Sequence, residues 1–205
     1  MNEKIQQVLL ETVLALSDAL DAKDQYTAGH SRRVKDYSAF IAEKMNLSDK
    51  EILWLKKSAL LHDLGKIGIP DAVLLKKTKL SEEEFDIIKT HPEVGADILK
   101  SLESLKDLVP AIFHHHERFD GKGYPHGLKG KNIPLFARII AVADSYDAMT
   151  TNRPYRKIIP YETVIKELER NKGVQFDPEI TEIFLGVLEE KAYHLSQVIE
   201  PEYYL

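Results

Sequence analysis

The spacing of the apolar residues restricts the fold of this chain more than any other feature. Apolar side chains recur every three or four residues through almost the whole sequence, as in the stripe formed by Val34, Tyr37, Ile41 and Met45. This spacing places such residues on one face of an α-helix. No stretch shows the strict alternation of apolar and polar residues that marks a half-buried strand. The sequence therefore predicts an all-α fold.

Helix starts can be located from their capping residues. Residues 48–51 and 81–84 have the serine-to-glutamate spacing of a capping box, in which each side chain accepts a hydrogen bond from the backbone N–H of the other residue. Pro92, Pro134 and Pro178 stand where the first turn of a helix would begin. Between these helices, residues 119–133 ("FDGKGYPHGLKGKNI") carry four glycines. A loop of this length in a compact helical domain is more often functional than idle.

The length of 205 residues, with 43% hydrophobic and 30% charged residues, fits one compact domain. We expect a helix over residues 1–22 and a main domain over residues 23–205. The apolar stripe of the first helix is equally compatible with the core of the chain, with a second copy in a homodimer, or with a signalling helix that continues from a preceding domain.

Composition excludes several classes of function. A net charge of −5 argues against binding long nucleic acid by bulk electrostatics. The absence of cysteine excludes disulfides and thiolate-ligated zinc, and it suits a cytoplasmic protein. No apolar run reaches the length of a membrane span, so we expect no membrane insertion.

Histidines are placed in a way that core packing does not require. Residues 114–125 read "HHHERFDGKGYP", and consecutive residues on a helix point about 100° apart, so three histidines cannot share one buried face. His62 and Asp63 lie together at the end of an apolar helix, and Asp144 is predicted at the end of a helix of small residues, where an ionised carboxylate without a partner is costly. A metal ion would satisfy all of these groups.

The candidate metal ligands are His30, His62, Asp63, His91, His115, His116 and Asp144. With Asp63 counted twice as a bridge, they would supply about eight of the roughly twelve positions around two octahedral ions. A bridging hydroxide and substrate oxygens or waters would fill the rest. Nitrogen and oxygen ligands without sulfur favour iron or manganese, with zinc, nickel and cobalt left open. Two such ions activate a water and clamp both sides of a phosphoryl displacement, which predicts a phosphohydrolase.

Taken in order, these motifs resemble the HD-GYP family, a bacterial branch of the HD phosphohydrolase superfamily that hydrolyses the signalling nucleotide cyclic di-GMP. The resemblance runs from "KDQYTAGHSRRV" through "HDLGKIGIPD", "HPEVGADIL", "HHERFDGKGYP" and "ADSYDAMTTNRPYR" to "GVQFDPEI", and Gly123, Tyr124 and Pro125 spell the motif that names the family. It implies an HD-domain-like helical bundle with the glycine-rich loop beside a buried metal site.

The resemblance also implies roles for individual residues. The seven candidates stand at the family's metal-ligand positions. Asp63 and Lys66 are expected to be catalytic, and Lys66 lies one turn past His62, where it would face the ions or else cap the exposed carbonyls of the helix end. Lys66, Tyr124, Arg153 and Arg156 are expected to contact the substrate. His114, Glu117 and Asp147 are not expected to bind metal, and the two carboxylates would orient ligands through hydrogen bonds.

Some family members carry a glutamate one turn before the position of His30 and assemble a third metal with it. Tyr26 stands there in this chain, and a phenol with a pKa of about 10 is a poor ligand for these ions. We therefore expect two metals, with linear pGpG as the main product and slow or no conversion to GMP.

Two other kinds of function remain open from the sequence. The chain could hydrolyse cyclic GMP-AMP or another nucleotide, as other HD enzymes do. It could also be a receptor that binds cyclic di-GMP, or docks other signalling proteins through the glycine-rich loop, without turnover. Retention of all seven ligand positions and of Lys66 favours an enzyme.

Overall fold

The structure is a computed structural model that describes residues 29–151 and 160–198, with side chains up to residue 190, and seven positions between Val8 and Ala19. The predicted all-α fold is confirmed for this described part, where an isolated bridge between Lys172 and Phe176 is the nearest approach to a strand. From residue 29 on, the described residues form these α-helices and short 3₁₀ helices, in order: α2 (His30–Lys44), α3 (Asp49–Leu61), η1 (Leu64–Gly68), α4 (Asp71–Leu74), α5 (Glu82–Ile88), α6 (His91–Lys100), η2 (Lys106–Leu108), α7 (Val109–His114), η3 (Gly130–Asn132), α8 (Leu135–Thr150), α9 (Tyr161–Arg170) and α10 (Pro178–Val198).

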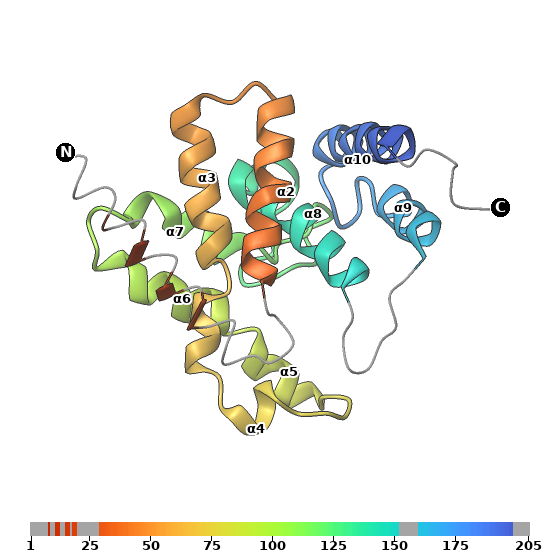
Figure 1. Ribbon diagram of the computed structural model, residues 1–205. Coiled ribbons are helices and arrows are strands. Elements are labelled where there is room, and N and C mark those ends of the chain that lie inside the picture. The colour runs from red at the N-terminus through yellow and green to blue at the C-terminus, as the bar shows by residue number, and fades with distance from the viewer. Residues whose placement is uncertain are drawn as a thin grey trace.

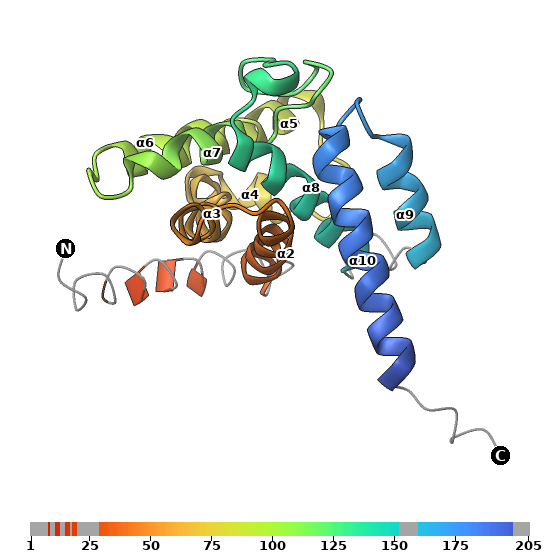
Figure 2. The same ribbon diagram turned by 90° about the horizontal axis from the view of Figure 1, so that it is seen from above.

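The helices form a bundle around α2 and α8. Figure 1 shows α2 and α3 side by side as a hairpin, with α8 against α2 and the pair α9 and α10 beyond it. On the other side α6 and α7 pack against each other, α7 packs against α3, and α6 packs against η1, which follows the end of α3. Figure 2, seen from above, shows the same order, with α8 between the α2–α3 hairpin and α10.

Two apolar clusters hold this arrangement together. The larger one joins α2, α3, α8, α9 and α10 and includes Ile41, Leu55, Ile140 and Phe184, all fully buried. The smaller one lies where α3, η1, α6 and α7 meet and includes Leu61, Leu64, Leu99 and Ile112. Full burial of a side chain of this size contributes about 1.5–3 kcal/mol. The ends of α3, α6 and α7 are therefore fixed next to one another.

Both predicted capping boxes are present. The Ser48 hydroxyl accepts from the Glu51 backbone N–H, the Ser48 N–H donates to the Glu51 carboxylate at 2.8 Å, and residues 81–84 repeat the pattern. The first box starts α3 at Asp49 and so sets the rotational phase that points Leu55 and Ala59 into the core. The helix then ends at His62.

A close backbone contact brings η1 onto the start of α6. A Cβ atom added at Gly65 would lie 1.8 Å from the carbonyl oxygen of His91 and 2.5 Å from the backbone nitrogen of Gly95. Only glycine permits this approach. Because Gly65 stands only two residues after Asp63, the contact places His62 and Asp63 beside His91.

The apolar stripe expected near the N-terminus is described at two positions, Val8 and Leu16, which are 55% and 42% exposed. These two side chains do not belong to the core of the chain, and the other members lie outside the described residues. Asp18 pairs with Arg32 of α2 at 2.7 Å. The division into residues 1–22 and 23–205 stays a prediction. Within the described residues, each helix is too short or too polar to cross a membrane.

Gly65→Ala tests the contact between η1 and α6. We expect the free energy of unfolding of the metal-free protein to fall by about 1–3 kcal/mol or more, because the added methyl group meets backbone that cannot move aside easily. Urea denaturation measures the change. The matched control is Gly186→Ala in α10, where an added Cβ meets no atom within 4 Å. It should leave stability equal or raise it by up to about 1 kcal/mol. Equal midpoints for the two variants would contradict the packing argument.

Candidate metal centre

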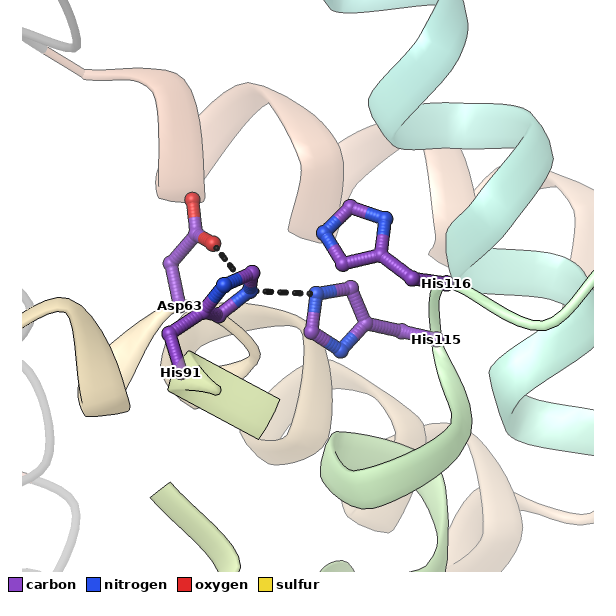
Figure 3. Close-up of side chains that lie close together, drawn as sticks. All are labelled: Asp63, His91, His115 and His116. Atoms are coloured by element: carbon purple, nitrogen blue, oxygen red, sulfur yellow. Dashed lines mark hydrogen bonds and ion pairs between the residues drawn. The ribbon is translucent and has the colours of Figure 1, made fainter. Parts of the chain in front are cut away.

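The seven predicted ligand residues come together in two neighbouring groups. Within each group, one candidate ligand atom from every residue lies within 4.8 Å of the others. The first group is Asp63, His91, His115 and His116, and the second is His30, His62 and Asp144. Figure 3 shows the first group, with His115 and His116 projecting from the end of α7 toward His91 and Asp63. The prediction that these residues converge is confirmed.

Helix ends supply six of the seven residues, and Asp144 is the exception. His30 and His91 open α2 and α6, while His62 and His115 follow the last residues of α3 and α7. The prediction that Asp144 ends its helix is wrong, because α8 continues to Thr150. The added turns are kept helical by side chains such as Met149, which is buried in the larger apolar cluster.

Asp63 lies between the two groups. Its Oδ1 is 3.3 Å from His91 Nε2 in the first group. Its Oδ2 is 3.4 Å from His62 Nε2 and 3.7 Å from His30 Nε2 in the second. Each carboxylate oxygen thus faces a different group, which is the geometry that a ligand bridging two ions requires.

Backbone carbonyls set which ring nitrogen of three histidines faces the centre. Nδ1 of His62, His91 and His115 each lies 2.7–2.8 Å from the carbonyl oxygen three residues earlier in the chain. A carbonyl only accepts, so each Nδ1 carries the proton and donates it. In a neutral imidazole Nε2 then has a free lone pair, as a metal ligand needs.

These lone pairs face each other with no proton between them. His91 Nε2 and His115 Nε2 are 3.2 Å apart, although both rings already place their proton on Nδ1. His62 Nε2 is buried and has no hydrogen-bond partner among the described residues; its neighbour Asp63 Oδ2 can only accept. A buried polar atom without a partner costs about 1–3 kcal/mol. A cation between these atoms removes the conflict, so the residues present fit a metal.

Burial keeps the first group in the ligand form. It lowers the pKa of His91, lowers that of His115 well below its usual value, and lowers that of His116 to about 3. Burial alone would raise the pKa of Asp63, but the positive charges of Lys66 and of His30 hold it well below its usual value. At neutral pH the first group therefore consists of neutral imidazoles and an ionised carboxylate, the protonation states that bind divalent ions.

His30 differs from the other ligands. Burial lowers its pKa, but hydrogen bonds to Asp144 and Asp147 outweigh burial and raise it to about 9. Its Nε2 lies 3.3 Å from Asp144 Oδ1, and its Nδ1 lies 2.7 Å from Asp147 Oδ2. Without metal the ring is a cation between two aspartates, so an ion that binds there must displace the proton on Nε2. Asp147 thus hydrogen-bonds to a candidate ligand residue, as expected, and its role in orienting that ligand stays a prediction.

Lys66 faces the centre as expected. Its Nζ lies 2.6 Å from Asp63 Oδ2, on the side of the second group.

The glycine-rich loop folds back onto the end of α7. A Cβ atom at Gly123 would lie 2.5 Å or less from backbone atoms of residues 116–118, so this glycine allows close contact between two chain segments. The Tyr124 ring lies 4.8 Å from the His116 ring at an angle of 30°. The loop thus places an aromatic ring directly on a candidate ligand residue.

Glu117 has a role that its position in the "HHE" run does not reveal. We expected it to orient a metal ligand, but its buried carboxylate accepts the backbone N–H groups of His126 and Leu128 at 2.9 and 3.0 Å. It therefore holds the glycine-rich loop. His114 packs against His126 and points its Nδ1 at Glu117 from 3.4 Å, outside both groups, as expected.

The family model described as "HD domain" matches residues 15–180 of the chain. The chain belongs to the HD domain family. HD domains are metal-dependent, and the buried histidine and aspartate cluster of this one could bind metal.

The relatives of this HD domain agree with the resemblance to the HD-GYP family. This chain is 42% identical over 167 residues to the 3′3′-cGAMP-specific phosphodiesterase 3 of Vibrio cholerae. The match covers 82% of this chain and 36% of that protein. The chain is also 42% identical over 184 residues to a cyclic di-GMP phosphodiesterase of Thermotoga maritima, covering 89% of this chain and 50% of that protein. The chain thus spans half or less of the length of these curated relatives.

Solved structures support the fold of this HD domain. The crystal structure of a cyclic GMP-AMP specific phosphodiesterase from Vibrio cholerae superposes with a TM-score of 0.69 at 24% sequence identity. The match covers 94% of this chain and 51% of the other. The HD-domain-like helical bundle that the motifs predict is confirmed.

Three of the predicted residues cannot be placed. Tyr26, Arg153 and Arg156 lie outside the described residues, so the two-metal argument from Tyr26 and the substrate contacts of the two arginines stay predictions.

Sequence reasoning missed Arg33, which binds Asp147. The available signal was its spacing of three residues from His30 on a predicted helix.

Neighbouring histidines offer a matched test of the metal centre. Wild-type protein should bind two ions per subunit, and three ions would contradict the count. His115→Ala should lower the affinity for one ion by at least about 100-fold, because even the loss of a hydrogen-bond partner of a ligand lowers metal affinity by about 10–100-fold. His114→Ala should leave both affinities unchanged. Titration of metal-depleted protein with Co²⁺, followed by absorbance and elemental analysis, measures both. Equal losses in the two variants would argue against the assigned ligand set.

Proposed function

We propose that this HD domain hydrolyses cyclic di-GMP to linear pGpG with two divalent metal ions, most simply iron or manganese. The observation that carries the proposal is the convergence of unprotonated imidazole nitrogens on the Asp63 carboxylate in a buried site. Relatives at 42% and 39% identity that are named cyclic di-GMP phosphodiesterases, from Thermotoga maritima and Xanthomonas campestris, support the choice of substrate.

We assign one ion to each group, with Asp63 bridging them. His91, His115 and His116 would hold the first ion, and His30, His62 and Asp144 the second. When bound, two such ions polarise a phosphodiester and lower the pKa of a shared water. The protein's part is to keep the imidazoles of the first group neutral and to orient all of the ligands in a buried site, where each charge acts more strongly than in water.

Lys66 is the residue that we propose for the leaving-group side. Its ammonium is already held by the Asp63 carboxylate, at 2.6 Å, close to where a phosphate would enter. From there it would bind a phosphate oxygen or donate a proton to the departing 3′ oxygen. Asp63 thus has two tasks, because it bridges the ions and positions Lys66.

Tyr124 is proposed to contact the nucleotide. Burial, together with Asp63 and Asp144, raises the pKa of its phenol, so the group keeps its proton and can donate a hydrogen bond to phosphate. Its ring, seated on His116, could alternatively stack on a guanine. Arg153 and Arg156 would hold the far phosphate of the dinucleotide through their guanidinium forks.

Cyclic GMP-AMP is the second candidate substrate. It is favoured by the relative from Vibrio cholerae whose name specifies 3′3′-cGAMP and which is 42% identical to this chain. The chemistry at phosphorus would be the same, and only base recognition would differ. A receptor without turnover, including one that docks other signalling proteins through the loop, is disfavoured because the described residues keep a complete ligand set and Lys66.

We further propose a cytoplasmic location, which the absence of cysteine suits, and a homodimer or signalling contact through residues 1–22. The exposure of Val8 and Leu16 supports the second of these proposals.

His62→Ala tests whether the centre is catalytic. We expect turnover of cyclic di-GMP to fall by at least about 1,000-fold, since the variant loses a ligand of the second ion, while the far-ultraviolet circular dichroism stays that of the wild type. Wild-type protein loaded with Mn²⁺, or with Fe²⁺ under anaerobic conditions, should convert cyclic di-GMP to pGpG with little GMP. A panel with cyclic GMP-AMP and mononucleotides ranks the substrates. Wild-type protein that carries metal and binds cyclic di-GMP without turnover would favour the receptor.

Lys66→Ala separates two roles of the ammonium. With cyclic di-GMP we expect a loss of about 10²–10⁴ in kcat, the range for a general acid. If Lys66 protonates the leaving oxygen, the loss should nearly vanish with bis-(p-nitrophenyl) phosphate, whose leaving group needs no proton. If Lys66 binds phosphate, the loss should persist. The control is Lys122→Ala, an exposed lysine of the glycine-rich loop. Full activity of Lys66→Ala would remove the residue from the mechanism.

A further inference from the structure

Two helices contribute residues to the centre in matched pairs. His30 and Arg33 stand three residues apart on α2, and Asp144 and Asp147 stand three residues apart on α8, so each pair lies on one helix face. The two helices pack side by side (Figures 1 and 2). His30 Nε2 faces Asp144, and one turn further out Arg33 faces Asp147.

Arg33 holds both oxygens of the Asp147 carboxylate. Its Nε donates to Oδ1 at 2.6 Å and its Nη2 donates to Oδ2 at 3.1 Å. Oδ2 is also the atom that accepts from His30 Nδ1, at 2.7 Å. Two parallel bonds from a rigid guanidinium fix the plane of a carboxylate as well as its position. The oxygen that meets His30 is therefore aimed by Arg33.

His30 depends on this arrangement more than the other histidines do. His62, His91 and His115 donate Nδ1–H to a backbone carbonyl of the preceding helix turn or segment, which needs no further support. His30 is the first residue of α2 and relies on a side chain from another helix. That side chain, Asp147, is 1% exposed, and a buried carboxylate without a cation nearby is costly. Arg33 supplies the compensating charge.

We propose that Arg33 is a positioning residue for one of the two ions. It holds Asp147 so that His30 turns Nε2 toward His62 and Asp144, the other members of the second group. This inference rests on the proposed metal centre. It predicts that loss of Arg33 weakens the second ion selectively, through His30.

The test is a Co²⁺ and Mn²⁺ titration of metal-depleted protein, with wild type, Arg33→Ala and Arg33→Lys. The binding phase that is weakened in His30→Ala identifies the second ion. Arg33→Ala should weaken that phase by about 10–100-fold, the usual effect of removing an outer partner of a metal ligand, and leave the other phase unchanged. Arg33→Lys keeps the positive charge but loses the two-pronged guanidinium, so its affinity for the second ion should fall between those of wild type and Arg33→Ala. If Arg33→Ala does not fold, the comparison of Arg33→Lys with wild type tests the proposal in its place.

Arg32→Ala is the matched control. Arg32 is the preceding residue on α2, its side chain is 54% exposed, and it binds Asp18 outside the centre. Both phases should be unchanged in this variant.

A double-mutant cycle distinguishes positioning from a general structural effect. In a His30→Ala background, Arg33→Ala should change neither phase by more than about twofold, since the residue it acts through is gone. An equal loss in both backgrounds, or an equal loss of both ions, would overturn the proposed role while leaving the metal centre intact. If wild-type protein binds no second ion, the failure lies with the metal centre itself and the role of Arg33 falls with it.

Discussion

The interaction on which the centre depends is a repulsive one. Three imidazoles commit their protons to backbone carbonyls and turn lone pairs toward each other and toward the Asp63 carboxylate, in a site with almost no water access. Neutral nitrogens and carboxylate oxygens at 3.2–3.4 Å do not stabilise a fold by themselves. They are tolerable because the rest of the molecule imposes them, and a cation converts the same geometry into a set of bonds.

Apolar packing imposes the geometry. The smaller cluster joins the ends of α3, α6 and α7, and the larger one fixes α2 against α8, so the ligands converge because helix ends converge. Glycine completes two of the contacts. Gly65 lets η1 rest on the start of α6, and Gly123 lets the loop rest on the end of α7. The loop is then held by Glu117, whose carboxylate satisfies two backbone N–H groups, and Tyr124 comes to lie on His116.

Local patterns carried most of what could be predicted. The helical period of the apolar residues, the capping boxes and the set of seven candidate ligands are properties of short stretches, and the structure agrees with them. Asp144 was placed at a helix end in error, since small residues before it resembled a terminus while buried Met149 after it prolongs the helix. Arg33 was missed because its partner Asp147 is 114 residues away. Glu117 was misjudged because its partners are backbone N–H groups of a loop, and the side-chain pattern does not show how that loop folds back.

The sequence by itself determined which residue types are available, on which helices, and that a metal would be needed to reconcile them. The tertiary structure decided how they divide into groups of four and three, which oxygen of Asp63 faces which group, and which ring nitrogen of each histidine is free. The physical reason is distance along the chain. His30 and Asp147 are separated by 117 residues, and no local periodicity records which atoms of such a pair will meet once the helices have packed.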